Sequence, residues 1–124
     1  MKSKYKLILL TAILCIAILI AFGQTNLDKT FVGYWTADDS KVRTVIFRDK
    51  DDVFQMVIWD SSDGEEVEVV KLQVTEKTIK TTEKVVSTNW VTYNTYSNVD
   101  ENTLKCIVGG DASSGTVIYL KRFK

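Results

Sequence analysis

The 124-residue chain contains no histidine, no proline and only two cysteines. The absence of histidine excludes Ser-His-Asp and Cys-His nucleophilic sites and every zinc site with imidazole ligands. Cys106 is the only cysteine outside the N-terminal apolar segment, so we expect neither an intrachain disulfide nor a thiolate zinc site. The chemistry that remains open uses carboxylate pairs, lysine bases or oxygen ligands for Ca²⁺.

An excess of positive charge is also lacking. The 16 basic and 16 acidic residues balance over the whole chain, and removal of the three lysines at positions 2, 4 and 6 leaves a net charge of −3. The two signs are interspersed along the chain and do not form a basic face. A nucleic-acid partner needs such a face, so we expect none.

Residues 1–23 have the three parts of a secretory signal peptide. The lysines at positions 2, 4 and 6 precede an apolar run over residues 7–22, and small residues stand at positions 21 and 23. This pattern predicts cleavage before Gln24 and a protein that is secreted or lies in the periplasm or cell envelope. Residues 24–124 are then expected to form one domain.

The N-terminal segment has two alternative interpretations, a membrane anchor and a lipoprotein signal. Residues 7–22 would anchor the protein in a membrane if they were not cleaved, although this run is shorter than the roughly 20 apolar residues of a spanning helix. A lipoprotein signal would use Cys15, but the bulky Leu14 before it argues against lipidation. We expect a membrane as a partner only through an uncleaved segment.

After residue 24, no segment shows the apolar spacing of a helix. Runs rich in β-branched and aromatic residues alternate with clusters of Asp, Asn, Ser and Gly, a pattern typical of strands and turns. The predicted strands are Thr30–Thr36, Val42–Arg48, Val53–Trp59, Glu66–Val74, Thr78–Val86, Asn89–Ser97, Thr103–Val108 and Thr116–Phe123.

The short connections between these runs predict an all-β fold. Parallel neighbours need crossovers of about a dozen residues, so all eight strands should be antiparallel and follow an up-and-down meander. Such a sheet leaves two open edges unless it closes, which favours a small eight-stranded barrel, with a two-sheet β-sandwich as the alternative. A switch in apolar parity predicts a β-bulge near Val69–Val70.

Two motifs at the ends of this meander resemble those of the calycins, which include lipocalins, fatty-acid-binding proteins and avidins. The first run contains Gly33-Tyr34-Trp35, a Gly-x-Trp motif, and the last run ends with Leu120-Lys121-Arg122-Phe123. The resemblance implies a lipocalin-like barrel in which Trp35 closes one end. Arg122, or Lys121, would cover the Trp35 ring in a cation–π contact. Gly33, Trp35 and Arg122 are thus expected to serve barrel closure.

Barrel size bears on what such a protein can bind. Strands of this length, at roughly 3.3 Å per residue, make a barrel about 23–30 Å tall. We therefore expect a filled core or a shallow cavity rather than a deep lipid-binding cavity.

The best candidate for binding is the sixth run. Alternation places Trp90, Thr92, Asn94 and Tyr96 on one face, where aromatic rings and hydrogen-bonding groups suit a sugar or a peptide. An ordinary strand rich in β-forming residues has the same composition.

Cys106 lies in the seventh run, where it shares a face with Leu104 and Val108. We expect it to be a small buried side chain, and the alternative is a reactive thiol.

The acidic turns at residues 49–52 and 60–65 lack the spacing of a Ca²⁺ loop, so we expect hairpin turns and no metal.

Together, the features of the sequence predict an exported, non-enzymatic binding or interaction module with no cofactor. Its partner is expected to be a small apolar or sugar-like ligand, or another protein. Two alternatives stay open: an interaction domain or inhibitor that acts through loops such as residues 109–115, and a His-free enzyme that uses carboxylates.

Overall fold

The computed structural model describes residues 26–37, 40–111 and 115–123, without the Asn26 side chain. The predicted signal segment, residues 1–23, and its cleavage site lie outside the described residues. One short helix, α2 (Asn26–Phe31), precedes eight strands. The strands are β1 (Gly33–Ala37), β2 (Val42–Arg48), β3 (Phe54–Asp60), β4 (Glu66–Val74), β5 (Thr78–Val85), β6 (Val91–Asp100), β7 (Thr103–Gly110) and β8 (Thr116–Arg122).

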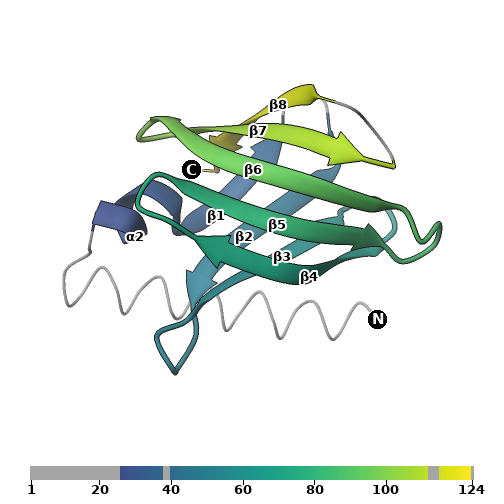
Figure 1. Ribbon diagram of the computed structural model, residues 1–124, viewed down its shortest axis with the longest axis horizontal. Helices are drawn as coiled ribbons and strands as arrows, with labels where there is room; N and C mark the ends of the chain where they lie inside the picture. Colours follow the sequence, from purple (N-terminus) through teal and green to yellow (C-terminus); the bar gives the residue numbers. More distant parts are fainter. Residues whose placement is uncertain (1–25, 38–39, 112–114, 124) are drawn as a thin grey trace.

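The eight strands form a closed antiparallel barrel (Figure 1). Each strand pairs with the next in the chain, and β1 pairs with β8 to complete the ring. Trp35 stands opposite Thr44 on one side and Arg122 on the other. This topology confirms the predicted meander and its closure, and the alternative of a two-sheet sandwich is wrong.

The observed registers show where the barrel bends. The register of β4 with β5 shifts between Val69 and Lys71, which confirms the predicted bulge. A second shift, between Asn98 and Asp100, lies at the end of β6, which runs three residues further than predicted. Bulges of this kind increase local twist and help a sheet to curve into a barrel.

Helix α2 was not predicted, and the first strand was placed too early. Thr30 and Phe31 belong to the helix, and β1 begins at Gly33. Six residues are too few to display helical periodicity, and a helix of this length gains its stability from packing. Phe31 is fully buried and Asp28 is paired with Arg48, so tertiary contacts hold α2 in place.

The two ends of the barrel differ. Helix α2 lies at one end, together with the hairpin connections β2–β3, β4–β5 and β6–β7 (Figure 1). The core is densest there, around the fully buried Phe31, Trp35, Ile46, Ile79 and Leu104. The connections β3–β4 and β5–β6 lie at the other end. In the described part of the chain, no helix is long and apolar enough to cross a membrane.

Candidate functional site

The half of the barrel away from α2 contains a cavity of about 370 Å³. It is lined by residues close to the strand ends at that side, such as Ala37 at the end of β1 and Val42 at the start of β2. The other lining residues are Ser40, Thr44, Ile58, Val67, Glu83, Val85, Thr92, Asn94, Tyr96, Cys106, Val108, Ile118 and Leu120. Most of these are apolar, so the cavity has an apolar wall with a few polar groups.

The polar residues that β5 and β6 contribute to the cavity form one network around Glu83, whereas Ser40 and Thr44 lie elsewhere on the wall. Oε2 of Glu83 accepts a hydrogen bond from the hydroxyl of Tyr96, at 2.6 Å, and another from the hydroxyl of Thr81. Nearby, Nδ2 of Asn94 donates to Oγ1 of Thr92 at 2.9 Å. All five side chains are buried, because alternation turns this face of each strand toward the interior.

Burial changes the protonation of these groups. Removal from water raises the pKa of Glu83, while hydrogen bonds from its polar neighbours act in the opposite direction and are the smaller effect. Burial, followed by the nearby Glu83 charge, raises the pKa of Tyr96 well above its ordinary value. The same two causes raise the pKa of Cys106 to about 12. Tyr96 and Cys106 therefore stay protonated at neutral pH, and the Cys106 thiol is buried, free and unreactive.

At the other end, Trp35 closes the barrel. The guanidinium carbon of Arg122 lies 4.3 Å from the centroid of the Trp35 ring, as the calycin resemblance implies. The indole Nε1 donates to the carbonyl of Phe31 at 2.9 Å, which joins the ring to α2. Lys121, the other candidate for covering the ring, instead donates from Nζ to Oγ1 of Thr103.

Arg122 is held by backbone carbonyls from both ends of the chain. Its Nη1 donates to Val32 at 2.6 Å, its Nη2 to Lys29 at 2.9 Å and its Nε to Glu101 at 3.0 Å. A β-carbon at position 33 would overlap Nη1 of Arg122. Since this guanidinium is fixed by three hydrogen bonds, it cannot easily move away, which accounts for Gly33.

The structure brings together three of the four predicted binding residues. Thr92, Asn94 and Tyr96 line the cavity, whereas Trp90 does not and is 52% exposed. Trp90 lies just before β6, which begins at residue 91, and directly follows a turn at Asn89, whose φ is 57°. The structure therefore does not bring Trp90 to the cavity with the other three predicted residues.

Glu83 is a cavity-lining residue that sequence reasoning missed. Other charged residues on this hairpin, such as Glu68 and Lys80, lie on the exposed outer face. By residue type alone, Glu83 cannot be distinguished from them. The signal that could have identified it is parity: Glu83 is an even number of residues from the buried Ile79 and an odd number from Lys80.

The acidic segments form hairpin turns in which aspartate side chains accept hydrogen bonds from nearby backbone amides. Asp49 accepts hydrogen bonds from the amides of Asp51 and Val53, and Asp60 accepts from the amide and hydroxyl of Ser62. Hydrogen bonds, chiefly those from the side chains of Gln55 and Ser62, lower the pKa of both aspartates. Among the described residues, no group of three or more His, Cys, Asp or Glu side chains could hold a metal ion.

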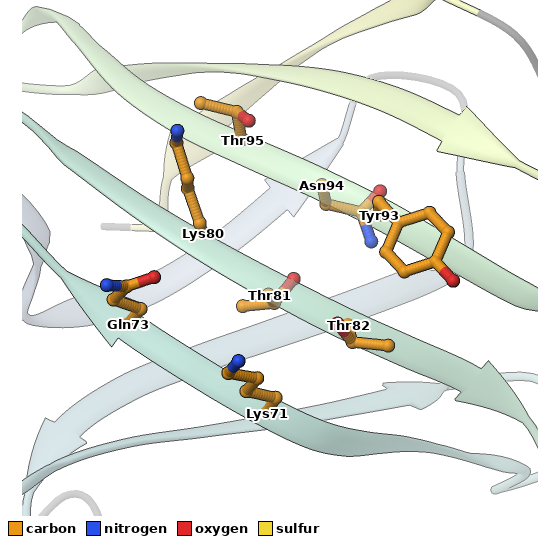
Figure 2. Close-up of a pocket in the computed structure, with 8 residues that line it drawn as sticks. All are labelled: Lys71, Gln73, Lys80, Thr81, Thr82, Tyr93, Asn94 and Thr95. Atoms are coloured by element: carbon orange, nitrogen blue, oxygen red, sulfur yellow. The ribbon is translucent and has the colours of Figure 1, made fainter.

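A second hollow, of about 220 Å³, lies on the outer face of β4, β5 and β6 (Figure 2). Its exposed or half-buried residues are Lys71, Gln73, Lys80, Thr82, Tyr93 and Thr95. Two further lining residues, Thr81 and Asn94, have buried side chains that belong to the interior. The outer hollow therefore has a solvated wall, and the cavity inside the barrel is the stronger candidate for a binding site.

No protein-family model matches the chain, and no curated protein sequence matches it. Among solved structures, it is similar to the crystal structure of Tp0751 (pallilysin) from Treponema pallidum. The TM-score is 0.50 and the sequence identity is 11%, over 90% of this chain and 94% of that chain. At this identity the likeness shows the fold alone: both chains form a β-barrel.

Proposed function

We propose that this protein is an exported, non-enzymatic binding protein whose barrel takes up one small, largely apolar molecule at the end opposite α2. The observation that carries the proposal is the cavity of about 370 Å³ with an apolar wall. Ligand pockets are typically about 300–1,000 Å³, mostly apolar, with a few polar groups that orient the ligand. Glu83, Thr92, Asn94 and Tyr96 supply such groups on one side of the cavity. The calycin resemblance of both chain ends is in accord with this role.

The cavity volume limits the size of the ligand. A water molecule in the liquid takes up about 30 Å³, so this space corresponds to about 12 water molecules. Covalently bonded atoms pack more closely than separate water molecules, so a molecule with roughly 12 to 18 non-hydrogen atoms is the expected ligand class. A long lipid would extend far beyond the barrel.

Binding without reaction is the expected outcome at this site. Hydrolysis by carboxylates needs two acidic groups whose pKa values differ. Among the described residues that line the cavity, Glu83 is the only carboxyl group, and Cys106 is held as an unreactive thiol. We therefore propose a binding role and no catalysis.

A bulky substitution inside the cavity tests this function. Val108 lines the cavity on β7, so Val108→Trp is expected to fill it and to lower the affinity for the neutral fluorescent dye N-phenyl-1-naphthylamine by about tenfold or more. Fluorescence titration of the purified protein, without residues 1–23, gives the two dissociation constants.

Ile107→Trp is the matched control, because Ile107 is the next residue on β7 and is exposed on the outside. This variant should bind the dye like the wild-type protein. Thermal melting of both variants checks that each is folded. Absence of dye binding in the wild-type protein, or equal binding in the folded Val108→Trp variant, contradicts the proposed function.

A further inference from the structure

The barrel buries two carboxylates in different ways. Asp28 on α2 is 2% exposed, and its Oδ1 lies 2.5 Å from Nε of Arg48. Glu83 is 8% exposed, yet no ion pair between described residues involves it. The described residues that line the cavity include no lysine or arginine. Asp28 thus has a cation beside it, whereas Glu83 has none among the described residues.

A buried carboxylate without a cation is costly. Removal from water disfavours its ionised form, and hydrogen bonds from neutral groups offset only part of that cost. Thr81 and Tyr96 donate to Oε2 of Glu83 and fix the carboxyl group, but they bring no positive charge. A cation that entered the cavity would meet an oriented carboxyl group in an environment of low dielectric, where charge pairing is strongest.

We infer that the ligand of this cavity is a small amine with an apolar body, bound as its ammonium ion to Glu83. The inference rests on the proposed function and specifies the ligand class. The ammonium group would bind Glu83, and the apolar body would contact apolar side chains of the cavity wall, such as Val42, Val67 and Val108. Ammonium hydrogen bonds to a carboxylate are roughly twice as strong as neutral ones.

Proton balance makes this binding dependent on pH. Below the raised pKa of Glu83 the carboxyl group is protonated, so an incoming ammonium ion displaces that proton into the solvent. Affinity for the amine should therefore fall as the pH falls through that pKa, by about tenfold per pH unit. The other titratable groups that face Glu83 are Tyr96 on β6 and Cys106 on β7, and both remain protonated because their pKa values are raised.

A competition experiment tests the inference. Octylamine and 1-octanol have the same shape and size, and each is titrated against the wild-type protein loaded with N-phenyl-1-naphthylamine. At neutral pH we expect octylamine to displace the dye at concentrations about tenfold or more below those of 1-octanol. Octanoate, with the opposite charge, should be the weakest competitor. In Glu83→Gln the ratio between amine and alcohol should fall to about one.

The outcomes separate the two proposals. If the dye binds and Val108→Trp removes binding, but octylamine and 1-octanol compete equally, the amine inference is overturned and the binding function stands. If the wild-type protein binds neither the dye nor octylamine, both are overturned. Should Glu83→Gln fail to bind the dye, the wild-type pH series decides: octylamine affinity that stays constant at low pH contradicts a role for Glu83.

Discussion

At the scale of single residues, Glu83 decides the chemistry of the cavity. Its neighbours, Thr81 and Tyr96, are neutral donors, and the surrounding wall is apolar. Natural proteins retain such costly groups where they serve a ligand, and perturbed carboxyl groups in cavities are accordingly candidates for function. If Glu83 binds the proposed ligand, stability and binding are therefore in opposition at this residue.

Glu83→Gln is expected to change how stability depends on pH. The folded-state pKa of Glu83 is raised, so the folded protein holds a proton that the unfolded chain releases. The wild-type protein thus loses stability as the pH rises from the unfolded pKa through the folded one, and Gln, which does not titrate, avoids this loss. Melting temperatures of both proteins from pH 4 to pH 8, in roughly half-unit steps, measure the effect. A difference that does not grow with rising pH contradicts burial of an ionised Glu83.

At the scale of elements, one buried ion pair attaches α2 to the β2–β3 hairpin, beside the hydrogen bonds that Trp35 and Arg122 donate to the helix. Asp28 is buried against Arg48, which also stacks on Phe54 with its guanidinium carbon 4.1 Å from the ring centroid. Arg48 ends β2 and Phe54 begins β3, so this contact joins the helix to a hairpin of the barrel. A six-residue helix has little stability of its own, and this attachment compensates for it.

Asp28→Ala should therefore destabilise the fold by about 3–5 kcal/mol, since it leaves the partly buried Arg48 without its buried partner. Urea denaturation followed by tryptophan fluorescence gives the free energy of unfolding. Asp52→Asn is the control: Asp52 also contacts Arg48, at 3.6 Å, but is 83% exposed, and loss of its charge should cost less than about 1 kcal/mol. Asn tolerates the positive φ of 61° at this position, so the backbone is not strained. Equal effects of the two substitutions would show that burial of the Asp28 pair is unimportant.

At the scale of the whole molecule, one end of the barrel is packed and the other contains the cavity. Trp35 connects β1 to α2 through its Nε1 hydrogen bond and to β8 through the Arg122 guanidinium. The strands that meet here, β1 and β8, are the first and last of the barrel, so this contact lies at the closure of the ring. Packing at this end leaves the cavity in the opposite half of the barrel, where the proposed ligand would enter.

Trp35→Ala is expected to destabilise the barrel by about 3–5 kcal/mol, because it removes a fully buried aromatic side chain. Trp90→Ala, at an exposed position, should change stability by no more than about 0.5 kcal/mol. Both values come from urea denaturation. A Trp35→Ala protein as stable as the wild type would contradict the role of Trp35 in barrel closure.

The sequence by itself determined the strand order, the closure and even one bulge. These features follow from local patterns: β-forming runs, turns of Asp, Asn, Ser and Gly, and connections too short for any but antiparallel neighbours. The bounds of β2 and β4 were predicted without error. The motif residues Trp35 and Arg122 were found because they stand at fixed places near the chain ends.

Only the tertiary structure decided what lies inside the barrel. Several strands are apolar on both faces, so their parity does not tell the interior from the exterior. In β5 parity groups Glu83 with Ile79, but only the closed barrel shows that this face is buried. Trp90 lies before the first residue of β6 and does not reach the cavity. Helix α2 could not be predicted because it is held by contacts with Arg48 and Trp35, and both of these residues lie outside the helical segment. Burial is a property of the packed molecule, and the uncompensated charge of Glu83 arises only when the strands enclose it.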